Sequence, residues 1–203
     1  MVKTKIAVLV SGGGTNLQAL IDASQAGKIP SGELALVVSN VPGAYALERA
    51  EKAGIPSAVV SRKILGSQEA FETELIRVLD EYGIQMVILA GFLSILTERV
   101  TSRFPRRMIN VHPALIPSFC GKGFYGLKVH EAALAYGVKV TGATVHFVNE
   151  VPDGGQIILQ KAVEILPGDT PEILQRRVME QAEWILLPQA AELVAAEIAK
   201  GEA

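Results

Sequence analysis

The chain has 203 residues, a length that suits one compact domain, and we expect a single domain over residues 1–203. Apolar residues make up 49% of the sequence and charged residues 20%, proportions that are typical of a globular protein and exclude a disordered one. The 19 basic and 21 acidic residues leave a net charge of -2, without a long block of either sign. This balance argues against nucleic acid as a partner and favours a small-molecule substrate.

The single cysteine, Cys120, excludes an internal disulfide. The first apolar run, residues 6–10, is too short for a signal peptide or a membrane span. We therefore expect a cytoplasmic protein that makes no contact with a membrane.

Apolar strands alternate with amphipathic helices through the first half of the chain. Strands are predicted at residues 6–10, 34–38, 58–60 and 86–90, and helices from Thr15 onward and at residues 44–53 and 67–81. Continuous apolar strands separated by helices are typical of a parallel sheet covered on both faces, with right-handed crossovers. The pattern predicts a doubly wound α/β fold.

The second half begins with a fifth predicted strand, residues 108–112, which polar side chains interrupt. A loop rich in glycine and proline follows at 113–126, then a helix at 127–136 and strands at 140–148 and 156–163. Thr170 and Pro171 open the last helical region as N-cap and first helical residue. We expect this region to break near Pro188 and to end in a surface helix over residues 190–200. The sequence contains neither an internal repeat nor a domain linker.

A glycine turn, Ser-Gly-Gly-Gly-Thr-Asn at residues 11–16, leaves the first strand and opens the first helix. Free backbone N–H groups and the positive end of the helix dipole meet there, so the phosphate of a mononucleotide could bind. Leu17 stands where a dinucleotide fingerprint has its third glycine, and no lysine follows as a P-loop requires. The alternative is a plain tight turn.

Asn110 and His112 lie two residues apart at the end of the fifth predicted strand, so their side chains point to the same side. Ligands bind at the carboxyl edge of an open α/β sheet. An amide and an imidazole are suitable donors to an oxyanion that forms on a carbonyl, and histidine can also exchange a proton near neutral pH. Alternatively, both residues only form the turn before Pro113.

Asp153 belongs to a turn, Val-Pro-Asp-Gly-Gly at residues 151–155, where aspartate is common for conformational reasons. Taken alone it would be structural. Near Asn110 and His112, its carboxylate could instead take the proton that an attacking amine releases.

The other histidines, His130 and His146, lack a short ligand spacing to His112, so we expect no metal site. His146 is interpreted first as a hydrogen-bonded core histidine, with support of the catalytic residues as the alternative. Cys120 has no evident general base beside it in sequence, and we do not expect it to act as a nucleophile.

Four segments in order resemble the glycinamide ribonucleotide formyltransferase family, folate-dependent enzymes of purine synthesis. They are residues 10–17, 89–93, 109–117 and 142–148 with Asp-Gly-Gly at 153–155, and the match extends over residues 5–188. The resemblance implies a mostly parallel sheet with helices on both faces and a C-terminal antiparallel addition. It also implies 10-formyltetrahydrofolate as formyl donor, glycinamide ribonucleotide as acceptor, and no metal. Whether the protein is a monomer or a homodimer stays open.

The resemblance assigns roles to individual residues. Catalysis would fall to Asn110, His112 and Asp153, with His146 as a possible support. The nucleotide would be bound by Gly14, Thr15 and Asn16 at its phosphate and by Glu183 at its ribose. The folate pocket would be lined by the backbone of residues 148–153 and by the side chains Phe92, Leu93, Ile95, Leu96 and Asn110.

The chain departs from the family pattern at several positions. Ser94 and Gln68 stand where many relatives have arginine, Lys128 replaces a frequent histidine, and Trp184 follows Glu183 where histidine is usual. The loop within residues 117–126 is longer than in many relatives, and the spacing from residue 177 to 183 is one residue longer. These changes affect the expected substrate contacts more than the expected chemistry.

Three rival functions fit parts of the pattern. Formyltetrahydrofolate hydrolase and methionyl-tRNA formyltransferase use a similar core, but each needs an added domain for which 203 residues leave no room, and the charge does not suit tRNA. A non-catalytic nucleotide-binding module is the third, since a fold alone does not establish an enzyme. Such a module would not need Asn110, His112 and Asp153 to meet at one cavity.

Overall fold

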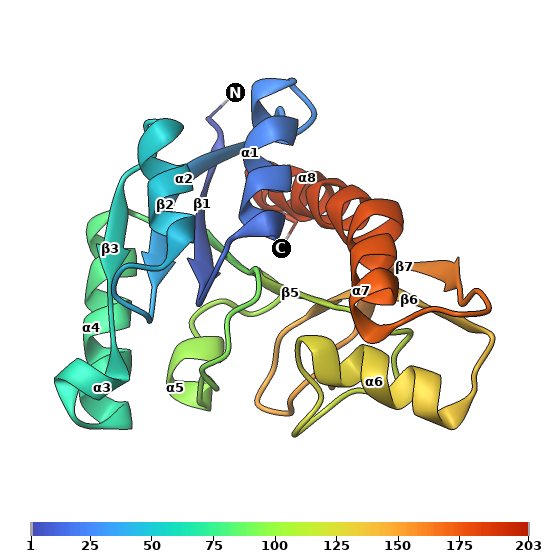
Figure 1. Cartoon of the computed structure of the whole chain (residues 1–203). Coiled ribbons are helices and arrows are strands. Elements are labelled where there is room, and N and C mark those ends of the chain that lie inside the picture. The colour runs from blue at the N-terminus through green and yellow to red at the C-terminus, as the bar shows by residue number, and fades with distance from the viewer. Residues whose placement is uncertain (1, 203) are drawn as a thin grey trace.

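The computed structural model describes residues 2–202 as one α/β unit (Figure 1). Its elements in chain order are β1 (Thr4–Val10), α1 (Thr15–Gln25), β2 (Gly32–Ser39), α2 (Tyr45–Lys52), β3 (Ser57–Val59), α3 (Arg62–Leu65), α4 (Gln68–Glu81), β4 (Met86–Leu89), α5 (Glu98–Thr101), β5 (Met108–His112), α6 (Leu127–Tyr136), β6 (Val140–Phe147), β7 (Ile157–Glu164), α7 (Pro171–Val178), a π-helical turn (Met179–Glu183) and α8 (Trp184–Lys200).

The seven strands form one sheet in the order β3-β2-β1-β4-β5-β6-β7. The first five in that order run parallel, while β6 is antiparallel to β5 and β7 to β6. The chain therefore winds outward from β1 in one direction and from β4 in the other. This confirms the expected doubly wound, mostly parallel sheet with a C-terminal antiparallel addition.

The hydrophobic core has two layers, one on each face of the sheet, and β1 contributes to both. Ile6, Val8 and Val10 pack on the side covered by α1, α2, α7 and α8, whereas Ala7 and Leu9 pack on the side of α4 and α5. All five side chains are fully buried. Burial on both faces explains why the strand reads as an unbroken apolar run, since alternate side chains of a strand point to opposite faces.

The predicted break near Pro188 is wrong. Pro188 lies inside α8, which continues from Trp184 to Lys200, and the irregularity lies before it in the π-helical turn at residues 179–183. A proline lacks the N–H that would bond to the carbonyl four residues earlier, here that of Trp184. Trp184 directly follows the π turn, so the missing bond falls where the α-helical ladder is only beginning.

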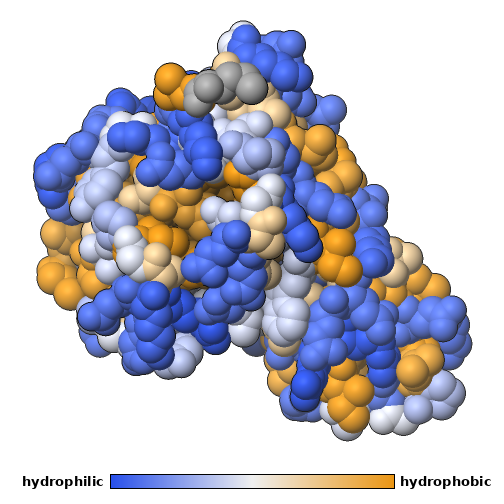
Figure 2. Space-filling view, turned by 90° about the horizontal axis from the view of Figure 1, so that it is seen from above, coloured by the Kyte–Doolittle hydropathy of each residue, from blue (hydrophilic) through white to orange (hydrophobic). Residues whose placement is uncertain are grey.

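The face seen from above in Figure 2 is largely hydrophilic, and hydrophobic residues gather in a hollow in its left half. The arrow of β1 points away from this face, toward the lower edge of Figure 1. The carboxyl ends of the parallel strands therefore lie on the opposite side of the molecule.

Within residues 2–202, no helix is long and apolar enough to cross a membrane.

We expect Gly142→Ala to destabilise the protein by about 2 kcal/mol or more, because a methyl group at this position of β6 overpacks the sheet. Its Cβ would lie 2.0 Å from the carbonyl oxygen of Lys161 on β7. Urea unfolding followed by circular dichroism measures the change. Gly12→Ala is the control, since a Cβ at Gly12 has no heavy atom within 4 Å. Equal unfolding midpoints for the two variants would contradict the prediction.

Candidate active site

Four segments meet where the parallel strands end. They are the glycine turn after β1, residues 90–97 after β4, residues 113–126 after β5, and residues 148–156 between β6 and β7. Parallel strands place their carboxyl ends at one edge, so segments that are distant in sequence become neighbours there. A candidate site at this edge was expected from the sequence.

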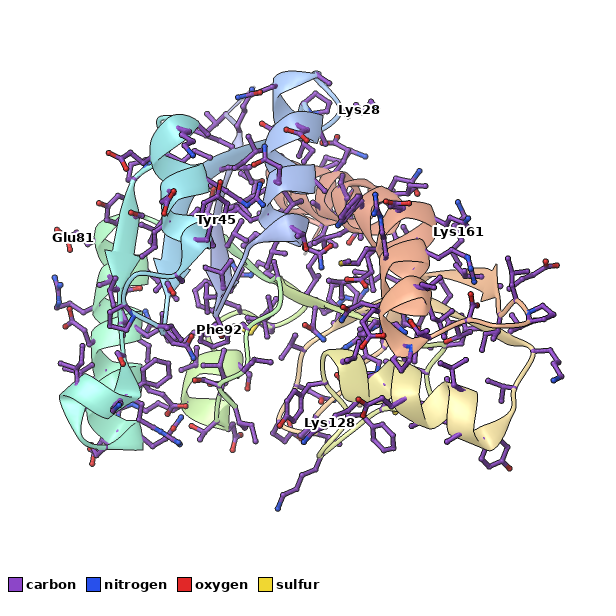
Figure 3. All side chains as sticks on the ribbon, in the orientation of Figure 1. Lys28, Tyr45, Glu81, Phe92, Lys128 and Lys161 are labelled. Carbon is purple, nitrogen blue, oxygen red and sulfur yellow. The ribbon has the colours of Figure 1, made fainter. Side chains whose placement is uncertain are left out.

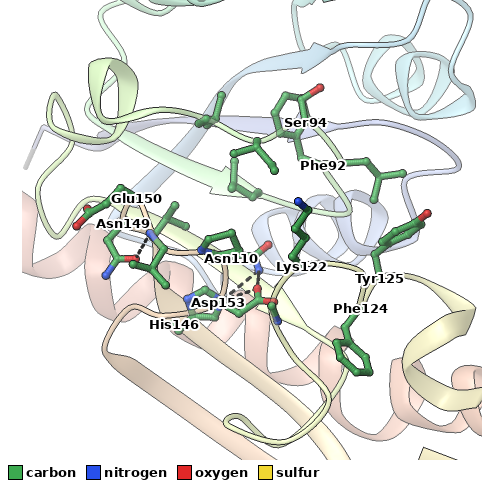
Figure 4. A pocket seen from close by; sticks show the side chains of 18 of the residues that line it. Phe92, Ser94, Asn110, Lys122, Phe124, Tyr125, His146, Asn149, Glu150 and Asp153 are labelled. Atoms are coloured by element: carbon green, nitrogen blue, oxygen red, sulfur yellow. Dashed lines mark hydrogen bonds and ion pairs between the residues drawn. The ribbon is translucent and has the colours of Figure 1, made fainter. Parts of the chain in front are cut away.

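A cavity of about 490 Å³ opens among these segments, within the usual range for small-molecule sites (Figure 4). Residues 92–96 form one side, residues 121–125 a second and residues 148–153 a third, with Leu89, Asn110 and His146 completing the lining. All five predicted folate-pocket side chains line this cavity, namely Phe92, Leu93, Ile95, Leu96 and Asn110. Leu93 and Ile95 are 62% and 63% exposed although they are large and apolar, so they offer uncovered surface to a ligand.

Asn110, His146 and Asp153 meet at the cavity (Figure 4). The amide nitrogen Nδ2 of Asn110 lies 3.1 Å from Nε2 of His146 and 3.5 Å from Oδ1 of Asp153. Nε2 of His146 also lies 3.5 Å from Oδ1 of Asp153. The three polar groups belong to β5, β6 and the turn after β6, and register brings two of them together, since Asn110 pairs with His146 across the sheet.

His112 approaches the same group from behind and does not line the cavity. It is 4% exposed, its Nδ1 lies 3.6 Å from Oδ2 of Asp153, and its Nε2 lies 2.8 Å from the carbonyl oxygen of Phe119. A carbonyl only accepts hydrogen bonds, so we infer that Nε2 carries the proton and, in a neutral ring, Nδ1 is the acceptor. The structure thus brings His112 to Asp153, while its Nε2 is occupied by the loop.

The charge states follow from burial and neighbours. Burial would raise the pKa of Asp153, but hydrogen bonding to His146, the nearby His112 and the N–H of Gly121 outweigh it and hold that pKa below its usual value. The Gly121 N–H donates to Oδ2 at 2.8 Å. Burial lowers the pKa of His112, and the Asp153 carboxylate opposes this only partly. At neutral pH the pair is therefore a carboxylate beside a neutral imidazole.

The turn that carries Asp153 is conformationally tight. Asp153 has a φ of 56°, in the left-handed region that aspartate tolerates better than most residues. A Cβ at Gly155 would lie 1.7 Å from the carbonyl oxygen of Phe147, so only glycine fits there. Conformation alone explains why aspartate and glycine occupy this turn. It does not explain why Asp153 also lies beside Asn110 and His112.

The glycine turn prepares the start of α1. Gly14 is the N-cap residue with a φ of 71°, and a Cβ there would lie 2.7 Å from Cβ of Ala46. No side chain caps this helix, so backbone N–H groups of its first turn, which includes Thr15 and Asn16, are not taken by a capping side chain. The hydroxyl oxygen of Ser11 accepts a hydrogen bond of 2.8 Å from the N–H of Leu93, which ties the glycine turn to the cavity wall.

Glu183 lies against Asn16. Its Oε2 accepts a hydrogen bond of 2.7 Å from Nδ2 of Asn16, and both side chains are buried. Burial raises the pKa of Glu183 to about 7, although the Asn16 bond opposes the rise. Among residues 2–202, Oδ1 of Asn16 finds no hydrogen-bond partner. A buried acceptor without a partner is rare in native proteins and fits a site for a polar ligand group.

Three residues that depart from the family pattern, Ser94, Gln68 and Lys128, form hydrogen bonds within the protein. The hydroxyl oxygen of Ser94 lies 2.6 Å from Nδ2 of Asn40, and Nε2 of Gln68 lies 3.0 Å from the carbonyl oxygen of Ile95. Lys128, near the start of α6 in Figure 3, donates to the hydroxyl oxygen of Tyr125 at 3.0 Å. These side chains now hold the protein's own loops.

The remaining candidates offer little chemistry. Burial and the nearby Asp153 raise the pKa of Cys120, which disfavours the reactive thiolate. His130 is fully buried, and burial lowers its pKa to about 4, so it is neutral. In the part of the chain that the structure describes, no cluster of three or more histidine, cysteine or carboxylate side chains could hold a metal ion.

Some lining residues were not singled out from the sequence, namely Leu89, Lys122, Phe124, Tyr125 and the side chains of residues 149–152. Gly121 was also missed, although its N–H bonds to Asp153. The available signal was the position of residues 113–126 directly after the strand that carries Asn110 and His112. A loop in that position borders the carboxyl edge whatever its composition.

The formyl transferase family model matches residues 4–190. This chain belongs to the formyl transferase family. Phosphoribosylglycinamide formyltransferase from Haemophilus influenzae is 42% identical over 184 residues, which cover 91% of this chain and 84% of that protein. The solved glycinamide ribonucleotide transformylase 1 from Symbiobacterium toebii superposes with a TM-score of 0.89 at 42% identity, covering 96% of this chain and 88% of the other.

Some relatives of similar sequence identity are much longer proteins. The trifunctional purine biosynthetic protein adenosine-3 from Gallus gallus is 45% identical over 195 residues, covering 95% of this chain. The chain spans only 18% of the length of that protein. Family membership implies a folate-derived formyl donor and small-molecule substrates in general terms.

We expect Glu183→Gln to stabilise the ligand-free protein at alkaline pH but not at acidic pH. The pKa of Glu183 rises from 4.5 to about 7 on folding, so the wild type loses stability as pH rises through this window. A glutamine keeps an acceptor for Asn16 without a charge, so its advantage near pH 8 should reach about 3 kcal/mol. Thermal unfolding between about pH 5 and pH 8 measures the difference. Glu180→Gln, at an exposed position of the same turn, is the control, and a pH-independent gap would contradict the prediction.

Proposed function

We propose that this chain transfers the formyl group of 10-formyltetrahydrofolate to the amine of glycinamide ribonucleotide, in de novo purine biosynthesis. The observation that carries the proposal is the convergence of Asn110, His112 and Asp153 beside a cavity that is tied to the glycine turn. The names of the relatives in Haemophilus influenzae and Symbiobacterium toebii agree with it. A binding module would have no use for this convergence, so we favour an enzyme.

The cavity suits the folate. Its wall at residues 92–96 presents exposed apolar surface for flat aromatic rings, and the turn at residues 148–153 offers backbone groups for their polar edges. The formyl carbon would then lie near Asn110, which lines the cavity beside Asp153. No metal is needed, because the reaction consists of amine attack and proton transfer.

The nucleotide fits beside the folate, at the start of α1. Backbone N–H groups at Gly14, Thr15 and Asn16 and the helix dipole would hold its phosphate. Glu183 would accept a hydrogen bond from a ribose hydroxyl, and the free Oδ1 of Asn16 offers a second acceptor nearby. The glycinamide amine would extend from there toward Asn110.

The chemistry begins when the amine attacks the formyl carbon and the carbonyl oxygen becomes an oxyanion. Nδ2 of Asn110 donates to that oxyanion. The attacking nitrogen loses a proton, which the Asp153 carboxylate accepts through water, since its low pKa keeps it ionised. The tetrahedral intermediate then collapses, the bond to the folate nitrogen breaks, and a proton returned from Asp153 completes the tetrahydrofolate product.

His112 has two possible contributions in this scheme. It can exchange a proton with Asp153, whose Oδ2 lies 3.6 Å from its Nδ1. Direct donation to the oxyanion requires Nε2 to leave the carbonyl oxygen of Phe119. His146 supports both partners by contacting Asn110 and Asp153. We propose further that residues 1–203 act as one formyltransferase domain, of which the family model matches residues 4–190, and that the protein functions as a monomer or a homodimer.

Purified protein should release tetrahydrofolate from 10-formyltetrahydrofolate only when glycinamide ribonucleotide is present. The absorbance change of the folate follows the release, and a parallel reaction without nucleotide measures hydrolysis by water. Equal rates with and without the nucleotide would favour a hydrolase and overturn the transferase.

We expect Asn110→Ala to lower kcat by about a hundredfold or more, since removing one donor from an oxyanion site costs that much in comparable enzymes. Asp153→Asn and His112→Ala should show similar losses while the KM for the nucleotide changes little. Stopped assays with each variant measure both constants, and circular dichroism checks the fold. Near-wild-type turnover in the Asn110 or His112 variant would remove that residue from the mechanism.

For Asp153, the decisive readout is the pH profile. The wild-type rate should fall on the acidic side as the Asp153 carboxylate becomes protonated, because only the carboxylate accepts a proton. The amide introduced by Asp153→Asn cannot titrate, so this acid limb should vanish together with most of the activity. Activity preserved across neutral pH in this variant would exclude Asp153 from the proton path.

A further inference from the structure

Residues 91–97, which we call the 91–97 loop, connect β4 to α5 and carry the apolar wall of the cavity. Side chains from three other segments fasten this loop. Ser11 accepts from the N–H of Leu93 at 2.8 Å, and the amide of Asn40 reaches Ser94 at 2.6 Å. The third attachment comes from α4, and its centre is Glu72.

Glu72 is a buried carboxylate, 2% exposed, whose two oxygens both bind the end of the 91–97 loop. Oε1 accepts from the backbone N–H of Thr97 and Oε2 from its hydroxyl, each at 2.7 Å. Nε2 of Gln68 donates to Oε1 at 2.9 Å and also to the carbonyl oxygen of Ile95 at 3.0 Å. One turn of α4 thus holds both Ile95 and Thr97.

The charge of Glu72 is maintained by these donors. Burial would raise its pKa, but the hydrogen bonds from Thr97 and Gln68, with a smaller effect of Arg99, outweigh it and lower the pKa below its usual value. Within the described residues, every hydrogen bond to this carboxylate comes from an uncharged donor. The ionised carboxylate is therefore a fixed acceptor for Thr97 and Gln68, and these hydrogen bonds hold the end of the loop in one position relative to α4.

Capping of α5 does not explain the arrangement. Thr97 is the N-cap residue of α5, yet its hydroxyl makes no cap bond and donates to Glu72 instead. Glu72 therefore fixes where the 91–97 loop ends, and Leu96 next to Thr97 lines the cavity. Glu72 itself does not line the cavity, so it can influence a ligand only through the loop.

We propose that Glu72 is a positioning residue for the formyl donor, which sets the wall of the donor pocket by binding Thr97. This inference rests on the proposed function for the identity of the ligand. The nucleotide site at the start of α1 is held by the hydrogen bond between Asn16 and Glu183, which does not involve the 91–97 loop, and its affinity should not respond. The signature of the role is therefore a change in affinity for one substrate only.

Steady-state kinetics with each substrate varied in turn tests this role in Glu72→Gln. Glutamine has the same size but one acceptor oxygen, so its NH2 group replaces one of the two acceptors, and the charge is lost. The Thr97 hydroxyl can then meet that NH2 group only as an acceptor, with its own proton turned away. We expect the KM for 10-formyltetrahydrofolate to rise about tenfold or more, with kcat and the KM for the nucleotide within about twofold of wild type. Glu74→Gln is the matched control, because Glu74 lies on the same helix, pairs with Arg77 and is remote from the loop contacts. A rise of both KM values by the same factor would overturn the proposal.

Thr97→Val examines the same bond from the loop side and serves also if the Glu72 variant does not fold. It keeps the backbone N–H and the side-chain shape but removes the hydroxyl, so the donor KM should rise by a smaller factor. In the double variant the two increases should not multiply, because both changes break one interaction. Independent, fully multiplying effects would contradict direct action through Thr97.

Binding of tetrahydrofolate by calorimetry separates this proposal from the proposed function. Weaker binding to Glu72→Gln than to wild type supports the positioning role even if no formyl transfer is seen. Equal binding to both, with only a lower melting temperature for the variant, would reduce Glu72 to a structural residue. Absence of transfer by the wild type would overturn the proposed function alone.

Discussion

The carboxylate of Asp153 joins the separate parts of the candidate active site. Its Oδ2 accepts from the N–H of Gly121 and faces His112, while its Oδ1 faces Asn110 and His146. A buried negative charge is costly unless donors surround it, so β5, β6 and the loop after β5 must all bring polar groups to one point. For this reason the polar residue Asn110 interrupts β5, which is otherwise mostly apolar. The hydrophobic core lies in the two layers to which β1 contributes.

The same demand extends to the loop at residues 113–126. Its backbone supplies the Gly121 donor to Asp153 and the Phe119 acceptor to His112, so it completes the candidate site through backbone atoms. Backbone groups are present whatever the side chain is. The loop can therefore differ in length and composition from that of relatives while it still provides hydrogen-bond partners to Asp153 and His112.

The sequence predicted the sheet well because burial on both faces leaves unbroken apolar runs. Strand geometry placed Asn110 and His112 at one edge, whereas the convergence with Asp153 was expected from the family resemblance. The sequence did not predict that Nε2 of His112 meets Phe119, since a backbone carbonyl leaves no trace in residue type. Glu72 was missed for a related reason. On α4 it resembles any helical glutamate, and its burial depends on a loop 25 residues away.

The π-helical turn at residues 179–183 has a consequence for how the C-terminal helices are compared between relatives. One extra residue in an α-helix rotates everything beyond it by about 100° and would turn Glu183 away from Asn16. A π turn accommodates one residue locally, so the helical phase of α8 and its buried stripe are preserved. A gap that an alignment places elsewhere in this region would assign the proposed ribose contact to a neighbouring position.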